Sequence, residues 1–91
     1  MSHKHEGTLR AIFHDPPSGN LHWRDVESLL NHVGAKIENQ SGASLHVTIN
    51  GQETVLHRPH HNNTLDRQGI KHLREYLARA GVTVAALAGE P

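Results

Sequence analysis

The stretch that decides the fold reads Ser44-Leu45-His46-Val47-Thr48-Ile49-Asn50-Gly51-Gln52-Glu53-Thr54-Val55-Leu56-His57. Residues 44–49 alternate polar with apolar side chains, which is the pattern of a strand buried on one face. Asn50-Gly51 is typical of a two-residue type I′ hairpin turn, so residues 52–57 are predicted to return as the antiparallel neighbour. The apolar side chains should face the core, which places Ser44 and His46 on the opposite face.

Upstream of this hairpin the period of the apolar residues changes from two to that of a helix. Residues 36–39 are predicted to add a third strand to the sheet. Before them, a helical stripe is formed by Trp23, Val26, Leu29, Leu30 and Val33. Gly34 suits the C-terminal cap of that helix. A shorter stripe, Leu9 with Ile12 and Phe13, predicts a first helix within residues 4–14, which the prolines of residues 15–20 end.

Downstream of the hairpin, residues 58–63 have the composition of a loop. A third helical stripe follows, made of Ile70, Leu73, Tyr76, Leu77 and Ala80. This helix is predicted to end at Gly81 and to begin after either Thr64 or Asp66 as its N-cap. The fold class is therefore α+β, with the order helix, helix, three antiparallel strands, helix, and with one sheet face covered by helices and the other open.

The overall composition indicates one small domain spanning residues 1–91. The core should lie within about residues 8–82, and residues 83–91 should form a flexible tail. The chain has no cysteine, and no stretch approaches the roughly 18 apolar residues that a membrane span requires. The first residues also lack the apolar run of a secretory leader, so we expect a cytoplasmic protein with no membrane partner.

Charge is balanced in total but uneven along the chain. Nine Lys and Arg residues match nine Asp and Glu residues, so the total gives no reason to expect tight binding to nucleic acid. Residues 15–53, however, carry two basic and five acidic side chains, whereas residues 58–79 carry five basic and two acidic ones. Ten histidines add positive charge below about pH 6.5.

Two blocks of sequence carry a resemblance to a known family. The first is Ser18-Gly19-Asn20-Leu21-His22-Trp23-Arg24-Asp25-Val26-Glu27. The second combines Asn50-Gly51, His57-Arg58-Pro59-His60, Gly69-Ile70-Lys71, Leu73-Arg74-Glu75-Tyr76-Leu77 and Ala80-Gly81-Val82. On these motifs the chain resembles the HicA toxin family. The resemblance implies a fold like that of double-stranded-RNA-binding domains, cleavage of mRNA without a metal or other cofactor, and neutralisation by a HicB-type antitoxin.

The resemblance also locates a catalytic position. Family members carry the active histidine in a Gly-Ser-His motif at the start of the second strand, whereas this chain reads Gly42-Ala43-Ser44-Leu45-His46. Ser44 stands at the catalytic position, and His46 lies two residues on, where its side chain projects from the same sheet face. We therefore expect His46 to act as the base, with Ser44 beside it. An ordinary exposed strand histidine is the alternative.

His57 is a further catalytic candidate, because histidine suits proton transfer near neutral pH. The side on which it lies is left open, since either Val55 or Leu56 could be the inward residue of its strand. The spacing of His57, His60 and His61 also matches that of paired metal ligands. No cysteine completes a set and a histidine-rich chain produces such spacings by chance, so no metal site is predicted.

Basic side chains gather on one loop and the helix after it. Predicted RNA contacts are Arg58, His60, Arg67, Lys71 and Arg74. The alternative is a solvated helix face, because Lys71 and Glu75 stand in i, i+4 spacing and could pair without a ligand. Trp23 could stack on a base, but at the start of an amphipathic helix a core position is the better interpretation.

Two functions from different classes follow. The first is a HicA-like toxin, a metal-independent endoribonuclease acting on mRNA. The second is a catalytically silent module of the same fold that binds RNA or protein, which the unusual Ala43-Ser44-Leu45 favours.

Overall fold

The computed structural model describes residues 3–14, 21–59 and 63–84. In chain order its elements are α1 (His3–Phe13), β1 (Leu21–His22), α2 (Trp23–His32), β2 (Lys36–Ser41), β3 (Ser44–Ile49), β4 (Gln52–His57), β5 (Thr64–Leu65) and α3 (Arg67–Arg79). The predicted α+β class and the order of the main elements are confirmed. The expected loop at residues 15–20, His60, His61 and most of the expected tail lie outside the described residues.

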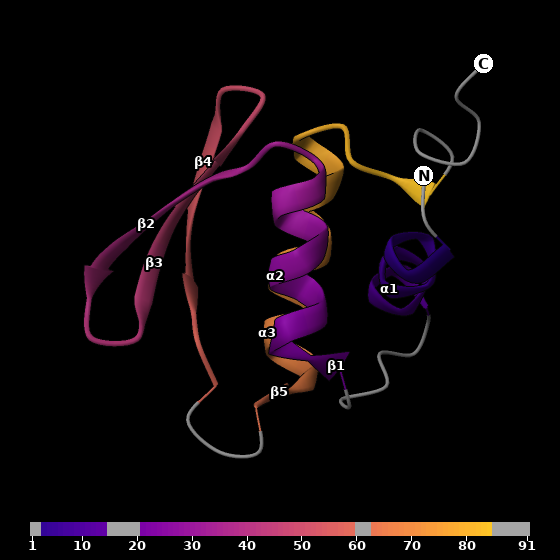
Figure 1. The fold of residues 1–91 in the computed structure, drawn as a ribbon, viewed down its shortest axis with the longest axis horizontal. Coiled ribbons are helices and arrows are strands. Elements are labelled where there is room, and N and C mark those ends of the chain that lie inside the picture. Colours follow the sequence, from indigo (N-terminus) through magenta and orange to yellow (C-terminus); the bar gives the residue numbers. More distant parts are fainter. Residues whose placement is uncertain (1–2, 15–20, 60–62, 85–91) are drawn as a thin grey trace.

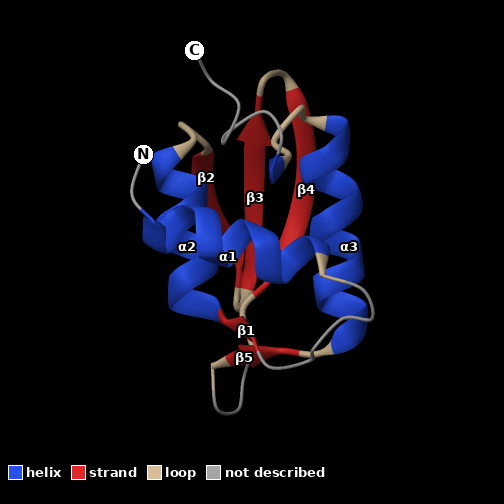
Figure 2. Ribbon diagram, turned by 90° about the vertical axis from the view of Figure 1, so that its right-hand side faces the viewer, coloured by secondary structure: helices blue, strands red, loops and turns tan. Residues whose placement is uncertain are grey.

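Three layers build the molecule (Figures 1 and 2). A three-stranded sheet forms the first, α2 and α3 lie side by side on one of its faces, and α1 crosses both helices on the side away from the sheet. Among the described residues, no element covers the other face of the sheet. None of the helices in this part of the chain has the length and apolarity to cross a membrane.

The sheet has the order β2-β3-β4 with both pairs antiparallel. Asn50 and Gly51 have φ values of 51° and 80°, which confirms the predicted type I′ turn. The turn pairs Leu45 with Leu56 and Ser44 with His57. Side chains of directly paired residues share a sheet face, so Leu56 is the inward residue and His57 lies on the open face with Ser44.

The core lies between the sheet and the helix pair. Leu45, Val47 and Ile49 of β3 are at most 2% exposed, which confirms the face assignment made from alternation. They pack with the buried residues of α2 and α3, and Trp23 is buried among them as predicted. From α1, Leu9 and Ile12 are fully buried in the same cluster. The helices thus use one sheet face and leave the polar face available.

A second, two-residue pairing was not anticipated. β1 pairs with β5 through Leu21 with Leu65 and His22 with Thr64, and the Trp23 N–H donates to the Asn63 carbonyl at 2.7 Å. This pairing joins the starts of α2 and α3. Thr64 is consequently a strand residue, and Asp66 is the N-cap of α3, where its Oδ1 accepts the Gly69 N–H at 2.7 Å.

Candidate active site on the open sheet face

His46 occupies the middle strand of the open face, as its position in the alternating pattern predicted. Its ring is flanked by carboxylates from both neighbouring strands. Nε2 lies 2.7 Å from Oε1 of Glu53, and Nδ1 lies 3.6 Å from Oε1 of Glu38. The His46 side chain is 29% exposed, whereas both carboxylates are more than half exposed. Solvent and a ligand can therefore reach all three groups.

The short contact to Glu53 determines which nitrogen of the His46 ring carries the proton. An ionised carboxylate only accepts hydrogen bonds, so Nε2 of His46 carries the proton that is donated to Glu53. In the neutral ring, Nδ1 then holds the free lone pair and is the nitrogen able to accept a proton. This is the arrangement in which a carboxylate orients a histidine base.

Neither carboxylate was predicted from the sequence as part of the site. Glu38 is directly opposite His46 on β2, and Glu53 is opposite Thr48 on β4, one step along the same face. The sequence held a signal for Glu53, because a two-residue turn at Asn50-Gly51 fixes which residues of β3 and β4 are paired. Glu38 had no such signal, because β2 joins β3 through a different turn and the pairing shifts between Asn39 and Ser41.

The three predicted catalytic residues share one surface. Ser44 and His46 lie two residues apart on β3, and His57 is the direct partner of Ser44 on β4. Ser44 is half-buried and His57 is exposed. The pairing brings a hydroxyl and two imidazoles to one end of the open face, where a substrate could contact all of them.

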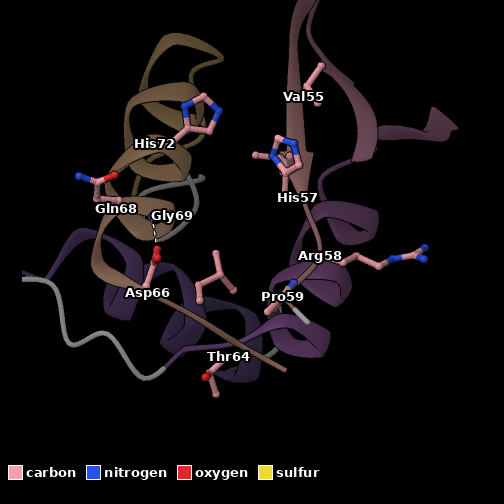
Figure 3. A pocket seen from close by; sticks show the side chains of 11 residues that line it. Val55, His57, Arg58, Pro59, Thr64, Asp66, Gln68, Gly69 and His72 are labelled. Carbon is pink, nitrogen blue, oxygen red and sulfur yellow. Dashed lines mark hydrogen bonds between the residues drawn. The ribbon is translucent and has the colours of Figure 1, made fainter. Parts of the chain in front are cut away.

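His57 also lines a groove between β4 and the first turns of α3 (Figure 3). The groove has a volume of about 650 Å³, and His72 and Asp66 of the helix side line it as well. Nε2 of His72 lies 3.1 Å from Oγ1 of Thr54. Neither the groove nor His72 was anticipated from the sequence, because the contact between β4 and α3 depends on how the layers pack.

The predicted basic contacts differ in their surroundings. Arg58 is exposed, and its Nη2 donates to Oδ1 of Asn39 at 3.5 Å. Arg67 and Lys71 are exposed on α3, and within residues 3–14, 21–59 and 63–84 neither forms an ion pair. Arg74 is half-buried and donates to the Ile12 and His14 carbonyls at 3.0 and 2.7 Å. His60 lies outside the described residues.

The open face carries several side chains able to transfer protons. Over the described ranges of the chain, no group of three or more His, Asp or Glu side chains is arranged to hold a metal ion. The open face offers a hydroxyl, imidazoles and carboxylates, which are groups that move protons.

The chain was also compared with families of known proteins. A family model described as the HicA toxin of bacterial toxin-antitoxin systems matches residues 23–82, which is more than half of the chain. The chain belongs to the HicA toxin family. The match runs from the start of α2 to the residues just after α3, so it includes the whole sheet and excludes α1. Membership in this HicA family places the chain among the toxins of bacterial toxin-antitoxin systems and implies an antitoxin partner. Neither the curated proteins nor the solved structures contain a match to the chain.

Proposed function

We propose that this HicA-family toxin is a metal-independent endoribonuclease that cleaves mRNA and is neutralised by a HicB-type antitoxin. The observation that carries the proposal is the His46 ring on the open face, accessible to a ligand and hydrogen-bonded to Glu53 at 2.7 Å. Family membership supplies the toxin role, and this geometry supports His46 as the base of the proposed reaction.

The reaction needs a base and an acid on either side of one phosphodiester. In our proposal, Nδ1 of His46 takes the proton of a ribose 2′-OH, and the 2′ oxygen attacks the adjacent phosphorus. The bond from phosphorus to the 5′ oxygen breaks, and protonated His57 donates a proton to that oxygen. The products are a 2′,3′-cyclic phosphate and a free 5′-OH. Ser44, opposite His57, would donate its hydroxyl hydrogen to a phosphate oxygen.

Phosphate contacts in this proposal come from the basic residues around the end of β4. Arg58 directly follows β4, and Arg67 and Lys71 are exposed on α3 without ion-pair partners among the described residues. Arg74 and His60 stay predictions of the sequence. Two N–H groups of Arg74 already bond the carbonyls of Ile12 and His14, which leaves fewer donors for RNA.

A second function is favoured by a specific observation. Glu38 and Glu53 place two carboxylates beside His46, and negative charge repels phosphate. A catalytically silent module whose open face binds a protein partner would accommodate these carboxylates. This alternative predicts no cleavage of RNA by the parent protein or by a variant with the family histidine restored.

The decisive experiment measures cleavage of a defined mRNA by purified parent protein and three variants. His46→Ala should reduce the rate by about a hundredfold or more, because loss of a positioned base costs roughly 10² to 10⁴. The free energy of unfolding of this variant should differ from that of the parent by less than about 0.5 kcal/mol, since the His46 side chain lies on the open face. His22→Ala removes an exposed histidine outside this sheet and should cleave at the parent rate.

The third variant, Ser44→His, restores the family position and should raise the rate if the present site is weakened. Full activity of His46→Ala with unchanged melting would move the base to His57. No cleavage by the parent and by Ser44→His would leave the binding module as the better function. In cells, expression without the antitoxin should slow growth and shorten message lifetimes.

A further inference from the structure

The groove between β4 and α3 has a composition that catalysis on the open face does not explain. Leu56 and Leu65 contribute apolar surface and are themselves at most 9% exposed. His57 lines the groove from the strand side and His72 from the helix side, and the His72 ring is directed toward β4 (Figure 3). Two flat rings over an apolar floor favour a flat ligand.

His72 has a hydrogen-bond partner on the strand side of the groove. Its Nε2 lies 3.1 Å from the Thr54 hydroxyl, a contact between α3 and β4 that favours one orientation of the imidazole. A ring held in place costs less entropy when a ligand packs against it. Aromatic and imidazole rings of this kind are the surfaces on which unstacked RNA bases pack.

Asp66 provides the polar edge of the groove. Its Oδ1 accepts the Gly69 N–H at 2.7 Å, and among the described residues its Oδ2 has no hydrogen-bond partner. A carboxylate accepts hydrogen bonds and repels phosphate, so the part of a ligand next to it must be neutral and rich in N–H groups. Arg58, the cation on the groove lining, points away from the space (Figure 3).

These features fit one class of organic ligand. The set of His57, Asp66 and His72 is not arranged to hold an ion, and no other such set occurs among the described residues. The volume of about 650 Å³ accommodates a purine base. Guanine alone among the four RNA bases presents two adjacent N–H donors, N1–H and the 2-amino group, along its pairing edge. On that edge uracil has one N–H between two carbonyl oxygens, and cytosine and adenine each have one amino group beside a ring acceptor, so none of them offers two adjacent donors to a carboxylate.

We propose that this groove is a subsite for a guanine base of single-stranded RNA. The base packs against the His57 and His72 rings, and its N1–H and 2-amino groups donate to the Asp66 carboxylate. The inference rests on the proposed function, because it names the substrate feature recognised beside the cleavage site. His57 lies on both surfaces, so a guanine in the groove would position the neighbouring phosphodiester near the open face.

Calorimetric titration of the full chain with 5′-GMP, 5′-AMP, 5′-CMP, 5′-UMP and inorganic phosphate tests the proposal. GMP should bind at least about tenfold more tightly than the other nucleotides, and phosphate should not displace it at equal concentration. Asp66→Asn keeps an N-cap acceptor for the Gly69 N–H and replaces the other oxygen with a donor. It should weaken GMP binding about tenfold with unchanged helix content.

Matched variants separate recognition of the guanine base from nonspecific effects of changing a charge or a ring on α3. Glu75→Gln removes a carboxylate from the exposed surface of the same helix, outside the groove, and should bind GMP like the parent. His72→Phe keeps a flat ring and should retain binding, whereas His72→Ala should lose it. Equal affinity for all four nucleotides, equal competition by phosphate, or an unchanged Asp66→Asn would each overturn the proposal.

The two proposals fail separately. His46→Ala should bind GMP like the parent, so binding is measured without cleavage. GMP binding with the stated variant pattern in a protein that cleaves no RNA would overturn the endoribonuclease and leave the base site standing. Cleavage of mRNA with no preference for sites beside guanine and no GMP binding would overturn the base site alone.

Discussion

Tyr76 shows at the scale of one residue how α3 is joined to the hairpin. Its side chain is fully buried, and its hydroxyl donates toward the Gln52 carbonyl at 2.8 Å and the Val47 carbonyl at 3.2 Å. One hydroxyl proton therefore contacts carbonyls from both β3 and β4. Burial raises the pKa of this phenol above its ordinary value of 10.0, because the charged form would lose its hydration.

Tyr76→Phe removes the hydroxyl while keeping the ring, and should lower the free energy of unfolding by about 1 kcal/mol at pH 7. A raised pKa means that the folded state holds its proton after the unfolded state has lost it. Stability from this group is thus fully present below pH 10.0 and is lost as pH rises through the raised value. Urea unfolding at pH 8 and pH 10.5 should show the parent losing more stability than the variant. Equal losses would contradict this account.

The candidate site also shows which residue positions the sequence can predict. Alternation along β3 placed His46 on the open face, because side-chain direction follows from backbone geometry alone. Its contact with Glu53 needed the pairing across the turn, which Asn50-Gly51 determines for any two-residue hairpin. The inward position of Leu56 follows from the same rule. His72 in the groove needed the packing of α3 against β4, which no local pattern encodes.

At the scale of elements, the β3–β4 turn also holds the end of α3. The Nδ2 group of Asn50 donates to the Ala80 carbonyl at 2.7 Å, and Ala80 is the C-cap residue of that helix. Asn50 also adopts a φ of 51°, a left-handed conformation that few residues other than Gly and Asn adopt readily. One residue therefore serves both the hairpin and the helix end.

Two substitutions at this turn separate its roles. Asn50→Gly keeps the backbone conformation and loses the bond to Ala80, which should cost about 1 kcal/mol of unfolding free energy. Asn50→Ala loses the same bond and adds about 1 kcal/mol for a left-handed alanine. Chemical denaturation of both variants measures the difference. Equal costs would show that backbone conformation contributes nothing here.

Helices and long strands were predictable because their apolar residues repeat over several turns or pairs. β1 and β5 contain two residues each, too few for any period to appear. Their pairing arises because α2 and α3 lie side by side and bring their preceding residues together. The choice of Asp66 over Thr64 as N-cap follows from the same pairing, since Thr64 is used in β5.

At the scale of the whole molecule, α1 adds a third layer to the residues that match the HicA family model. α1 lies outside the residues matched by the HicA family model and packs across α2 and α3 (Figure 2). Leu9 and Ile12 of α1 are fully buried against the rest of the core. Arg74 of α3 donates hydrogen bonds to two carbonyls at the C-terminal end of α1. Near its N-terminal end, the rings of His5 and His32 stack with centroids 4.4 Å apart and an angle of 21°. This stack is one of the contacts between α1 and α2.

His5 should weaken that contact on acidification. Partial burial, then the neighbouring His32 and Lys4, lower the pKa of His5 below its ordinary value of 6.5. The unfolded state then takes up a proton before the folded state does, so stability is complete above pH 6.5 and falls as pH drops below it. Hydrogen exchange at pH 7.5 and 5.5, corrected for intrinsic rates, should show α1 amides losing more protection than α3 amides.

The control variant is His5→Gln. In the parent protein, Nε2 of His5 lies 2.9 Å from the Ser28 hydroxyl. A glutamine can keep a hydrogen bond to this hydroxyl but cannot gain charge. In that variant the extra loss in α1 should shrink, because the remaining histidines act on α1 and α3 in both proteins. An undiminished loss would show that the sensitivity arises elsewhere.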